Sequence, residues 1–424
     1  MPSMHVSVIK AACFSVLFAL AVLSVCAQSA DEKSLDDIDV MFMDTEDVDE
    51  PVVKEEDALP AAVTVSVNGL SVPLAFSGHL SSEVGLGAIY EDGSTSSTTA
   101  FSFTNYLYMN ARPDSTMSVH GAIKTAYPDF GVSLYEMYFT YVLFGRVFIT
   151  AGKKDTAWGY PRIFTSFADS KSYLKKEETI VTEDTYTNIL YDSQSGVSGL
   201  VRIPFAFGTL TGVMLYHGTD SSPKQNDVSV AASLELIVFD TSINFFGRKY
   251  PSASGSMASY HQTPIAGVEI KRTLLGFDIY GQSMARISNY KKLRDEGTDA
   301  FDDSVQKIIS TAGFYRLWDG FTPNIGANVE YQDIYYPGAK EHSQRIGIDA
   351  GISKLGPAKN IKVGALWRHS ITDNNGYVKP AVSVSGILPH ATWDTGVKID
   401  YGNSSSYKAP KYTFVTAISV SLDY

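Results

Sequence analysis

The feature that most constrains this chain is a series of eighteen segments in which apolar and polar side chains alternate. A period of two predicts β-strands with one apolar and one polar face. In residues 324–332, for example, Ile325, Val329 and Tyr331 alternate with polar residues and glycine. The segments are 74–90, 100–112, 117–127, 132–142, 146–154, 196–204, 207–217, 227–239, 242–250, 263–272, 275–287, 305–317, 324–335, 344–354, 359–369, 378–387, 390–401 and 411–424.

The connections between these segments are of two kinds. Each connection after an even-numbered segment is short, whereas those after odd-numbered segments tend to be longer and more polar. The longer ones include EDGSTSSTT at 91, HGTDSSPKQN at 217, residues 288–304 and GNSSSYKAP at 402. Transmembrane β-barrels sort their connections in this way, with short turns on one rim and long loops on the other. We therefore predict an all-β, antiparallel up-and-down transmembrane barrel of about 18 strands over residues 61–424, with 16 strands as the alternative.

The last segment, KYTFVTAISVSLDY, shows why the barrel must close. Hydrocarbon offers no water to backbone groups, so every N–H and C=O must pair within the sheet and the final strand must pair with the first. Four apolar residues of this strand share the parity expected to face lipid: Ile418, Val420, Leu422 and Tyr424. The strand ends on an aromatic residue and resembles the C-terminal signal that the barrel-assembly machinery reads in bacterial outer-membrane proteins. We expect these four residues to form that assembly signal.

The first 27 residues have the pattern of a signal peptide. Lys10 precedes an apolar run from Ala11 to Val25, which is too short to span a bilayer comfortably, and Val25-Cys26-Ala27 forms a small-residue cleavage site before Gln28. Lipid attachment at Cys26 is an alternative. The only two cysteines lie in this leader, so the mature chain has none, which suits an oxidising periplasm.

The acidity of the chain is concentrated in one short segment. Residues 31–60 hold 13 acidic residues and two lysines, whereas residues 61–424 are nearly neutral. A charge run with two prolines predicts a disordered periplasmic tail over 28–60. It is either a solvated linker or a docking or pore-plugging element that uses the apolar residues between Ile38 and Met43. No basic nucleic-acid footprint is present.

The parity opposite to the apolar one carries the charges expected inside the barrel. These pore-lining candidates balance in sign, which predicts weak charge selectivity. The positive set is Lys124, Arg202, Lys271, Arg286, Arg345, Lys362, Arg368 and Lys398, and the negative set is Glu136, Glu235, Glu269, Asp278, Glu330, Asp349, Asp394 and Asp400. For each residue, the alternative is a side chain that only pairs across strands and holds water.

The longest connection, residues 155–195, is the third on its rim. In order and length it resembles the third external loop of general porins, which folds into the barrel and narrows it. That resemblance makes Lys175, Lys176, Glu177 and Glu178 constriction candidates. An outward surface loop is the alternative.

The stretch GKKDTAWGYPRIFTSFAD, from Gly152 to Asp169, leads into this connection. It resembles a pattern found in porin-like barrel proteins of several bacteria, including spirochaetes. The matching residues are Gly152, Lys153, Trp158, Gly159, Phe164 and Asp169, whereas Lys154 stands where glutamine is usual. The resemblance implies a porin-like barrel but names no solute.

These observations predict an outer-membrane porin for passive diffusion of small hydrophilic solutes. The alternatives are a substrate-specific outer-membrane transporter and a surface adhesin that uses the long loops. The chain is not expected to be an enzyme, and no cofactor or metal site is expected. Expected partners are outer-membrane lipid, the assembly machinery, a periplasmic partner of the acidic tail and further copies in a homo-trimer. The expected location is the outer membrane of a diderm bacterium, with a periplasmic tail and surface-exposed loops.

Overall fold

The computed structural model describes residues 63–67, 70–127, 131–154, 163–164, 196–216, 228–249, 264–320, 322–402 and 409–424. All of them belong to one compact unit, Val53–Tyr424. The predicted signal peptide, the acidic tail and the constriction candidates Lys175, Lys176, Glu177 and Glu178 lie outside the described residues. None of the described helices is long and apolar enough to cross a membrane.

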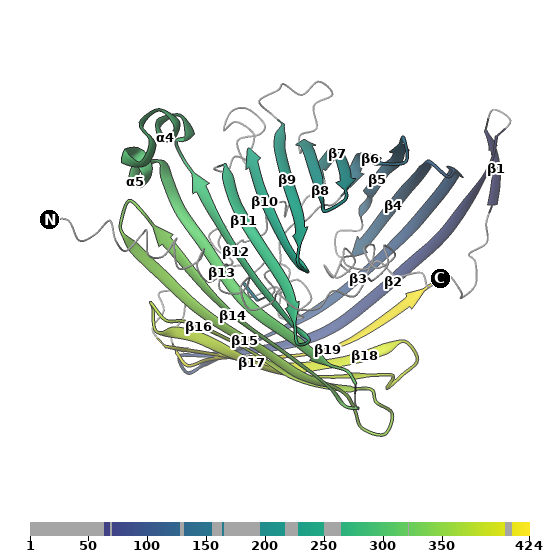
Figure 1. Ribbon diagram of the computed structural model, residues 1–424. Helices are drawn as coiled ribbons and strands as arrows, with labels where there is room; N and C mark the ends of the chain where they lie inside the picture. Colours follow the sequence, from purple (N-terminus) through teal and green to yellow (C-terminus); the bar gives the residue numbers. More distant parts are fainter. Residues whose placement is uncertain are drawn as a thin grey trace. The chain divides into compact units, whose positions relative to one another are not determined.

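Eighteen of the described strands form a closed antiparallel barrel (Figure 1). Each strand from β2 to β18 pairs with the next, and β19 pairs back with β2 from Tyr412 opposite Tyr90 to Asp423 opposite His79. The predicted barrel and the count of 18 are confirmed. The strands are β2 (Leu70–Glu91), β3 (Ser94–Asp114), β4 (Met117–Tyr127), β5 (Gly131–Leu143), β6 (Val147–Lys154), β7 (Gly196–Phe205), β8 (Gly208–Tyr216), β9 (Ser229–Val238), β10 (Thr241–Lys249), β11 (Ile265–Leu274), β12 (Phe277–Ile287), β13 (Val305–Trp318), β14 (Asn324–Tyr336), β15 (Glu341–Leu355), β16 (Ile361–Ser370), β17 (Asn375–Ser385), β18 (Ala391–Gly402) and β19 (Lys411–Asp423).

A further strand, β1 (Val63–Val67), was not predicted from the sequence. It pairs with the first residues of β2, from Val63 opposite Leu74 to Val67 opposite Leu70. The residues between the two strands in the sequence are Asn68 and Gly69, a dipeptide typical of two-residue hairpins. That dipeptide was the signal that could have identified the hairpin.

The first long connection, expected at residues 91–99, is instead a tight turn. β2 continues to Glu91 and β3 begins at Ser94, and the two turn residues Asp92 and Gly93 have φ of 50° and 77°. Asp-Gly adopts these positive φ values readily, and this allows the strands to continue through the Ser/Thr-rich sequence.

The connection over residues 288–304 folds into short helices. These are α4 (Tyr290–Glu296), η4 (Gly297–Ala300) and α5 (Phe301–Ser304). Asn289 caps α4 because its side chain accepts a hydrogen bond from the backbone N–H of Lys292, at 3.1 Å. The Lys292 ammonium lies 2.6 Å from the Asp303 carboxylate, and this hydrogen bond lowers the pKa of Asp303.

The contacts of Ile163 and Phe164 show which face of the sheet is inside. Both belong to the connection between β6 and β7, yet both donate backbone hydrogen bonds to Glu330 on β14. The nine steps from Lys154 to Ile163 span at most about 32 Å. The shorter way round the ring from β6 to β14 is eight strand spacings, which measure at least ~38 Å around the outside. Ile163 and Phe164 therefore lie inside the barrel, and the face that carries Glu330 is the inner face.

Because residues paired across strands point to the same side, the register assigns every other strand residue to a face. The outer face carries many exposed apolar side chains. They include Val84, Leu86, Val197, Met214, Phe245, Phe314, Phe414 and Ile418.

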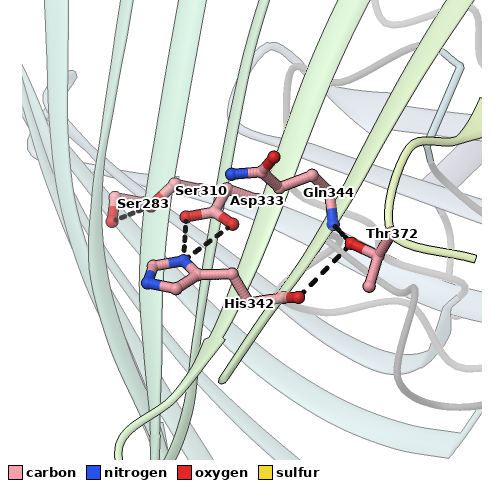
Figure 2. A network of polar contacts seen from close by, with 6 residues as sticks. All are labelled: Ser283, Ser310, Asp333, His342, Gln344 and Thr372. Atoms are coloured by element: carbon pink, nitrogen blue, oxygen red, sulfur yellow. Dashed lines mark hydrogen bonds and ion pairs between the residues drawn. The ribbon is translucent and has the colours of Figure 1, made fainter. Parts of the chain in front are cut away.

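On the outer face, residues near the long-connection ends of β12 to β15 and Thr372 after β16 form the polar contacts that Figure 2 shows. The Ser283 and Ser310 hydroxyls lie 3.0 Å apart, and the Asp333 carboxylate lies 3.0 Å from Nδ1 of His342. The Thr372 hydroxyl accepts a hydrogen bond from the backbone N–H of Gln344 at 2.8 Å. This network marks one border of the apolar band.

The C-terminal residue closes the ring on the outer face. Tyr424 and Gly78 exchange two backbone hydrogen bonds, at 2.6 and 2.9 Å. The Tyr424 ring lies across Gly78, and its hydroxyl donates to Oδ1 of Asn105 on β3 at 3.0 Å. The last aromatic residue thus joins β19 to both β2 and β3. Ile418, Val420, Leu422 and Tyr424 all lie on this face and are exposed. Their reading by the assembly machinery stays a prediction.

Replacing Gly78 by alanine is expected to lower the unfolding temperature of the barrel by several degrees. The new Cβ would lie 2.2 Å from the Tyr424 ring and displace it, and an aromatic contact contributes about 0.5–1.5 kcal/mol. Heat-dependent mobility on detergent gels measures the transition. Gly85→Ala is the matched control on the same strand, because its Cβ would come no closer than 3.8 Å to a neighbour. Equal midpoints for the two variants would contradict the role of Tyr424.

Candidate functional site in the barrel lumen

The centre of the candidate site is the buried carboxylate of Glu330 on β14. Its Oε2 accepts hydrogen bonds from the backbone N–H groups of Ile163 at 2.8 Å and Phe164 at 2.9 Å. Its Oε1 accepts one from the hydroxyl of Tyr280 on β12. Glu330 is fully buried, and a buried carboxylate is tolerated only when its oxygens accept such bonds.

Arg368 on β16 holds the other side of the same segment. Its Nη2 donates a hydrogen bond to the carbonyl oxygen of Ile163, and its guanidinium carbon lies 6.0 Å from the centre of the Phe164 ring. The backbone of Ile163 is thus bound at both its N–H and its C=O by charged side chains of the opposite wall. We call this arrangement of Glu330, Arg368, Ile163 and Phe164 the lumen clamp.

Two inner-face glycines on either side of Glu330 make room for the lumen clamp. Gly347 on β15 is paired with both Glu330 and Arg368, and a Cβ there would lie 2.6 Å from Cγ2 of Ile163. Gly313 on β13 is paired with Glu330, and a Cβ there would lie 2.7 Å from the Tyr280 ring. The absent side chains allow Ile163 to approach the wall and Tyr280 to reach across one strand.

The register places all the sequence-predicted pore-lining residues on the inner face. They are Lys124, Glu136, Arg202, Glu235, Glu269, Lys271, Asp278, Arg286, Glu330, Arg345, Asp349, Lys362, Arg368, Asp394, Lys398 and Asp400. The lumen clamp brings only Glu330 and Arg368 together. The others are spread over the wall, and whether they line a conducting path stays a prediction.

Several of these charges interact with a neighbour on the wall. Lys398 lies 3.2 Å from Asp400, and Lys271 lies 3.9 Å from Asp278. Glu269 accepts hydrogen bonds from Asn244 and Gln282. The two ion pairs lower the net field that a passing ion would experience, whereas the amide contacts leave the charge of Glu269 in place.

The sequence analysis missed other charged residues of the inner face. Arg248, Lys307 and Lys379 are buried there, on β10, β13 and β17. No candidate was selected on these three strands, although the alternation within each strand separates the face of these residues from the apolar one, and Lys307 is paired with the selected Arg286. Phe164 belongs to the porin-like motif, but no pattern in the sequence indicated that it contacts β14 and β16.

The inner face is not polar throughout. An apolar cluster of buried side chains covers the inner wall of β8 to β14 towards the long connections: Val213, Ala231, Phe246, Ile265, Met284, Ile309 and Ile334. By contrast, the inner wall of β3 to β5 is half-exposed at Tyr106, Tyr138 and Lys124. Arg202 on β7 and Lys362 on β16 are exposed on the inner face, so the accessible lumen wall is not confined to one side of the barrel.

Gly152 accounts for one position of the porin-like motif. Its φ is 138°, and a Cβ would lie 2.2 Å from the carbonyl oxygen of Met137, so only glycine fits. Lys153, which follows it, lies on the outer face. Trp158, Gly159 and Asp169 lie outside the described residues. Among the residues that the structure describes, no group of three or more His, Cys, Asp or Glu side chains could hold a metal ion.

Comparison with known proteins finds no matching family model and no matching curated protein. Among solved structures, the chain is similar to Pseudomonas aeruginosa OccK11 (OpdR), with a TM-score of 0.49 and 9% identity over 82% of this chain and 96% of that chain. It is also similar to Pseudomonas aeruginosa OccD3 (OpdP), with a TM-score of 0.48 and 8% identity over 82% and 91%. A mutant of the Rh. blastica porin gives 0.43 and 9% identity over 82% and 100%.

The lumen clamp predicts a disulfide between cysteines placed at positions 163 and 347. The Cβ atoms would lie within about 4 Å of each other, which is the range of a disulfide. The test uses the full chain with Cys13→Ser and Cys26→Ser, and compares mobility on reducing and non-reducing gels. The control pair, Ile163→Cys with Gly351→Cys, lies about 13 Å further along the same strand face and should not cross-link. Equal cross-linking of both pairs would contradict the placement of Ile163.

Proposed function

We propose that this protein is an outer-membrane porin, through which small hydrophilic solutes diffuse with weak charge selectivity. The observation that carries the proposal is the contrast between the two faces of an 18-strand ring. Its outer face is apolar, as lipid requires, and its inner face carries charges of both signs. Barrels of 16–18 strands leave room for an aqueous channel, whereas those of eight are filled by side chains.

The lumen clamp gives this channel a constriction. Ile163 and Phe164 are bound to the inner wall at β14 and β16, so these two residues occupy part of the lumen. A solute must pass beside them, along accessible inner-face residues such as Lys124, Arg202 and Lys362. The constriction proposed here is formed by the clamp, while a part for Lys175, Lys176, Glu177 and Glu178 stays a prediction.

The orientation in the membrane is also a proposal. With an even number of barrel strands, β2 begins and β19 ends on the same rim, which is the rim of the short turns. We place this rim and the N-terminal tail in the periplasm and the long connections at the cell surface. In this orientation, Ile418, Val420, Leu422 and Tyr424 would present the final strand to the assembly machinery. A homo-trimer and a periplasmic partner of the tail stay hypotheses.

Planar-bilayer conductance of the refolded protein tests the proposal. We expect stepwise, persistent openings and a reversal potential close to zero in a salt gradient. A substrate-specific transporter would instead give steps that its own class of solute blocks at low concentration. A protein that folds as a heat-modifiable barrel and never conducts would contradict the porin and favour a surface-binding protein.

Glu330→Ala is expected to change the conductance because it releases Ile163 and Phe164 from the inner wall. Two buried backbone N–H groups would lose their acceptor, at a cost of about 1–3 kcal/mol each. Larger and noisier steps should result. Glu269→Ala is the matched control: Glu269 is also a buried carboxylate of the inner wall, but its hydrogen bonds to Asn244 and Gln282 lie within the wall. If both variants behave like the wild type, the lumen clamp does not limit the pore.

A further inference from the structure

The short-turn rim carries exposed apolar side chains at the tips of four consecutive turns. Phe144, Phe207, Phe239 and Leu275 lie in the turns that follow β5, β7, β9 and β11, and they are 86%, 60%, 75% and 83% exposed. Exposed single apolar residues are common on proteins, but a run over four neighbouring turns forms a continuous surface. We call it the apolar turn arc.

Three of these residues occupy backbone conformations that bulky side chains avoid. Phe144, Phe239 and Leu275 have φ of 55°, 49° and 54°. Positive φ favours glycine, asparagine or aspartate, as in the Asp92-Gly93 turn on the opposite rim. The side chains therefore gain no stability from local backbone preference, and they gain little from packing because they are exposed. Polar turn residues such as Lys359 and His390 have similar φ values, so this arc is distinguished by its exposed apolar side chains.

The apolar turn arc is continuous with the apolar outer face. The rings of Phe207 and Phe205 meet edge to face with centroids 5.0 Å apart, and Phe205 is the last residue of β7. Val238 and Leu274 end β9 and β11 beside the turn residues Phe239 and Leu275, and both are exposed. The lipid-facing band thus extends to the turn tips in this sector. The turns after β3 and β15 are polar, with Asp114 and Lys359, whereas the turn after β17 carries the exposed residues Ile387 and Leu388.

Two outer-face arginines lie at the same level. Arg316 on β13 donates from Nη1 to the carbonyl oxygen of Leu275 at 2.8 Å, and its guanidinium lies 4.5 Å from the Phe277 ring centre and 5.1 Å from that of Trp318. These contacts hold the Arg316 charge at the level of the turn that follows β11. An arginine directed from an apolar face towards an aromatic-rich border is the arrangement that reaches lipid headgroups.

Arg272 on β11 is the second cation of this sector. It is paired with Ile279, which is paired with Phe314, two residues before Arg316 on the same outer face. Its Nε and Nη1 are buried without a hydrogen-bond partner among the described residues. Guanidinium groups bind phosphate through paired donors, so a phosphate oxygen that reached these buried atoms would satisfy them.

We propose that the apolar turn arc is immersed in the phospholipid leaflet on the short-turn side, and that Arg272 and Arg316 bind the phosphates of that leaflet. Phe144, Phe207, Phe239 and Leu275 then lie in the zone between acyl chains and headgroups. This proposal rests on the barrel spanning a membrane, as in the proposed function, but not on its conducting solutes.

Nitroxide labels on single cysteines test the depth of the arc. The full chain with Cys13→Ser and Cys26→Ser is labelled at Phe239→Cys, at Ala358→Cys in the polar turn after β15, or at Phe245→Cys on the outer face of β10. In vesicles of phosphatidylethanolamine and phosphatidylglycerol, we expect position 239 to be relaxed more by oxygen than by a water-soluble nickel chelate. Position 358 should show the reverse.

Each other result of this experiment has a defined meaning. Equal exposure of positions 239 and 358 to the nickel chelate overturns the immersion. Protection of position 239 from both relaxing agents places a protein on the arc, either a second copy or a periplasmic partner, and also overturns it. Position 245 separates these results from a failure of the proposed function, because a label there that meets water means that the barrel does not span the bilayer.

Lipid retention tests the arginines. Native mass spectrometry of the detergent-purified full chain, titrated with phosphatidylglycerol or phosphatidylcholine, should show preferential binding of the anionic lipid. A charge near a membrane surface changes the affinity about fivefold, so Arg272→Gln and Arg316→Gln should each weaken phosphatidylglycerol binding by about that factor. Lys354→Gln, near the polar turn after β15, is the charge-matched control. Loss of binding in the control alone, or in none of the variants, would contradict the phosphate assignment.

Discussion

The structure depends on the pairing of the last strand with the first. Backbone groups in hydrocarbon have no partner except another strand, so β19 must pair with β2 along its length, and it does so over twelve residue pairs. This closure gives every strand two neighbours and assigns every strand side chain to lipid or to lumen. The charge balance of the lumen, the apolar outer band and the position of Ile163 and Phe164 against the inner wall all depend on a closed ring.

Three aromatic side chains of this barrel lie across a glycine of the next strand. Tyr424 crosses Gly78 at the seam, and Tyr280 crosses Gly313 to reach Glu330. Phe246 similarly covers Gly267 within the apolar inner cluster. A glycine weakens a strand by leaving a gap in its face, and a neighbouring ring fills that gap while linking three strands. The same device therefore serves both the closure of the ring and the support of the lumen clamp.

The alternation of the sequence was sufficient to predict the barrel, the number of strands and the parity of the charged residues, because a period of two allows each residue only two orientations. Local turn chemistry was harder to read. Asp92-Gly93 forms a tight turn in a polar stretch that resembled a loop. In the sequence, Asn68-Gly69 separates β2 from β1, a strand that was not expected. The lumen clamp could not be predicted. Ile163 and Glu330 are 167 residues apart, and no periodicity relates a loop backbone to the side chain that binds it.

The most direct test of the account is the conductance of the barrel with positions 163 and 347 joined by a disulfide. The cross-link would hold position 163 against β15, where the structure places it, without altering Glu330 or Arg368. If the clamped state is the open porin, oxidised channels should show the same step size and ion preference as the wild type, before and after reduction. Oxidised channels that stay closed and open only on reduction would contradict it, because the clamped lumen would then be a blocked one.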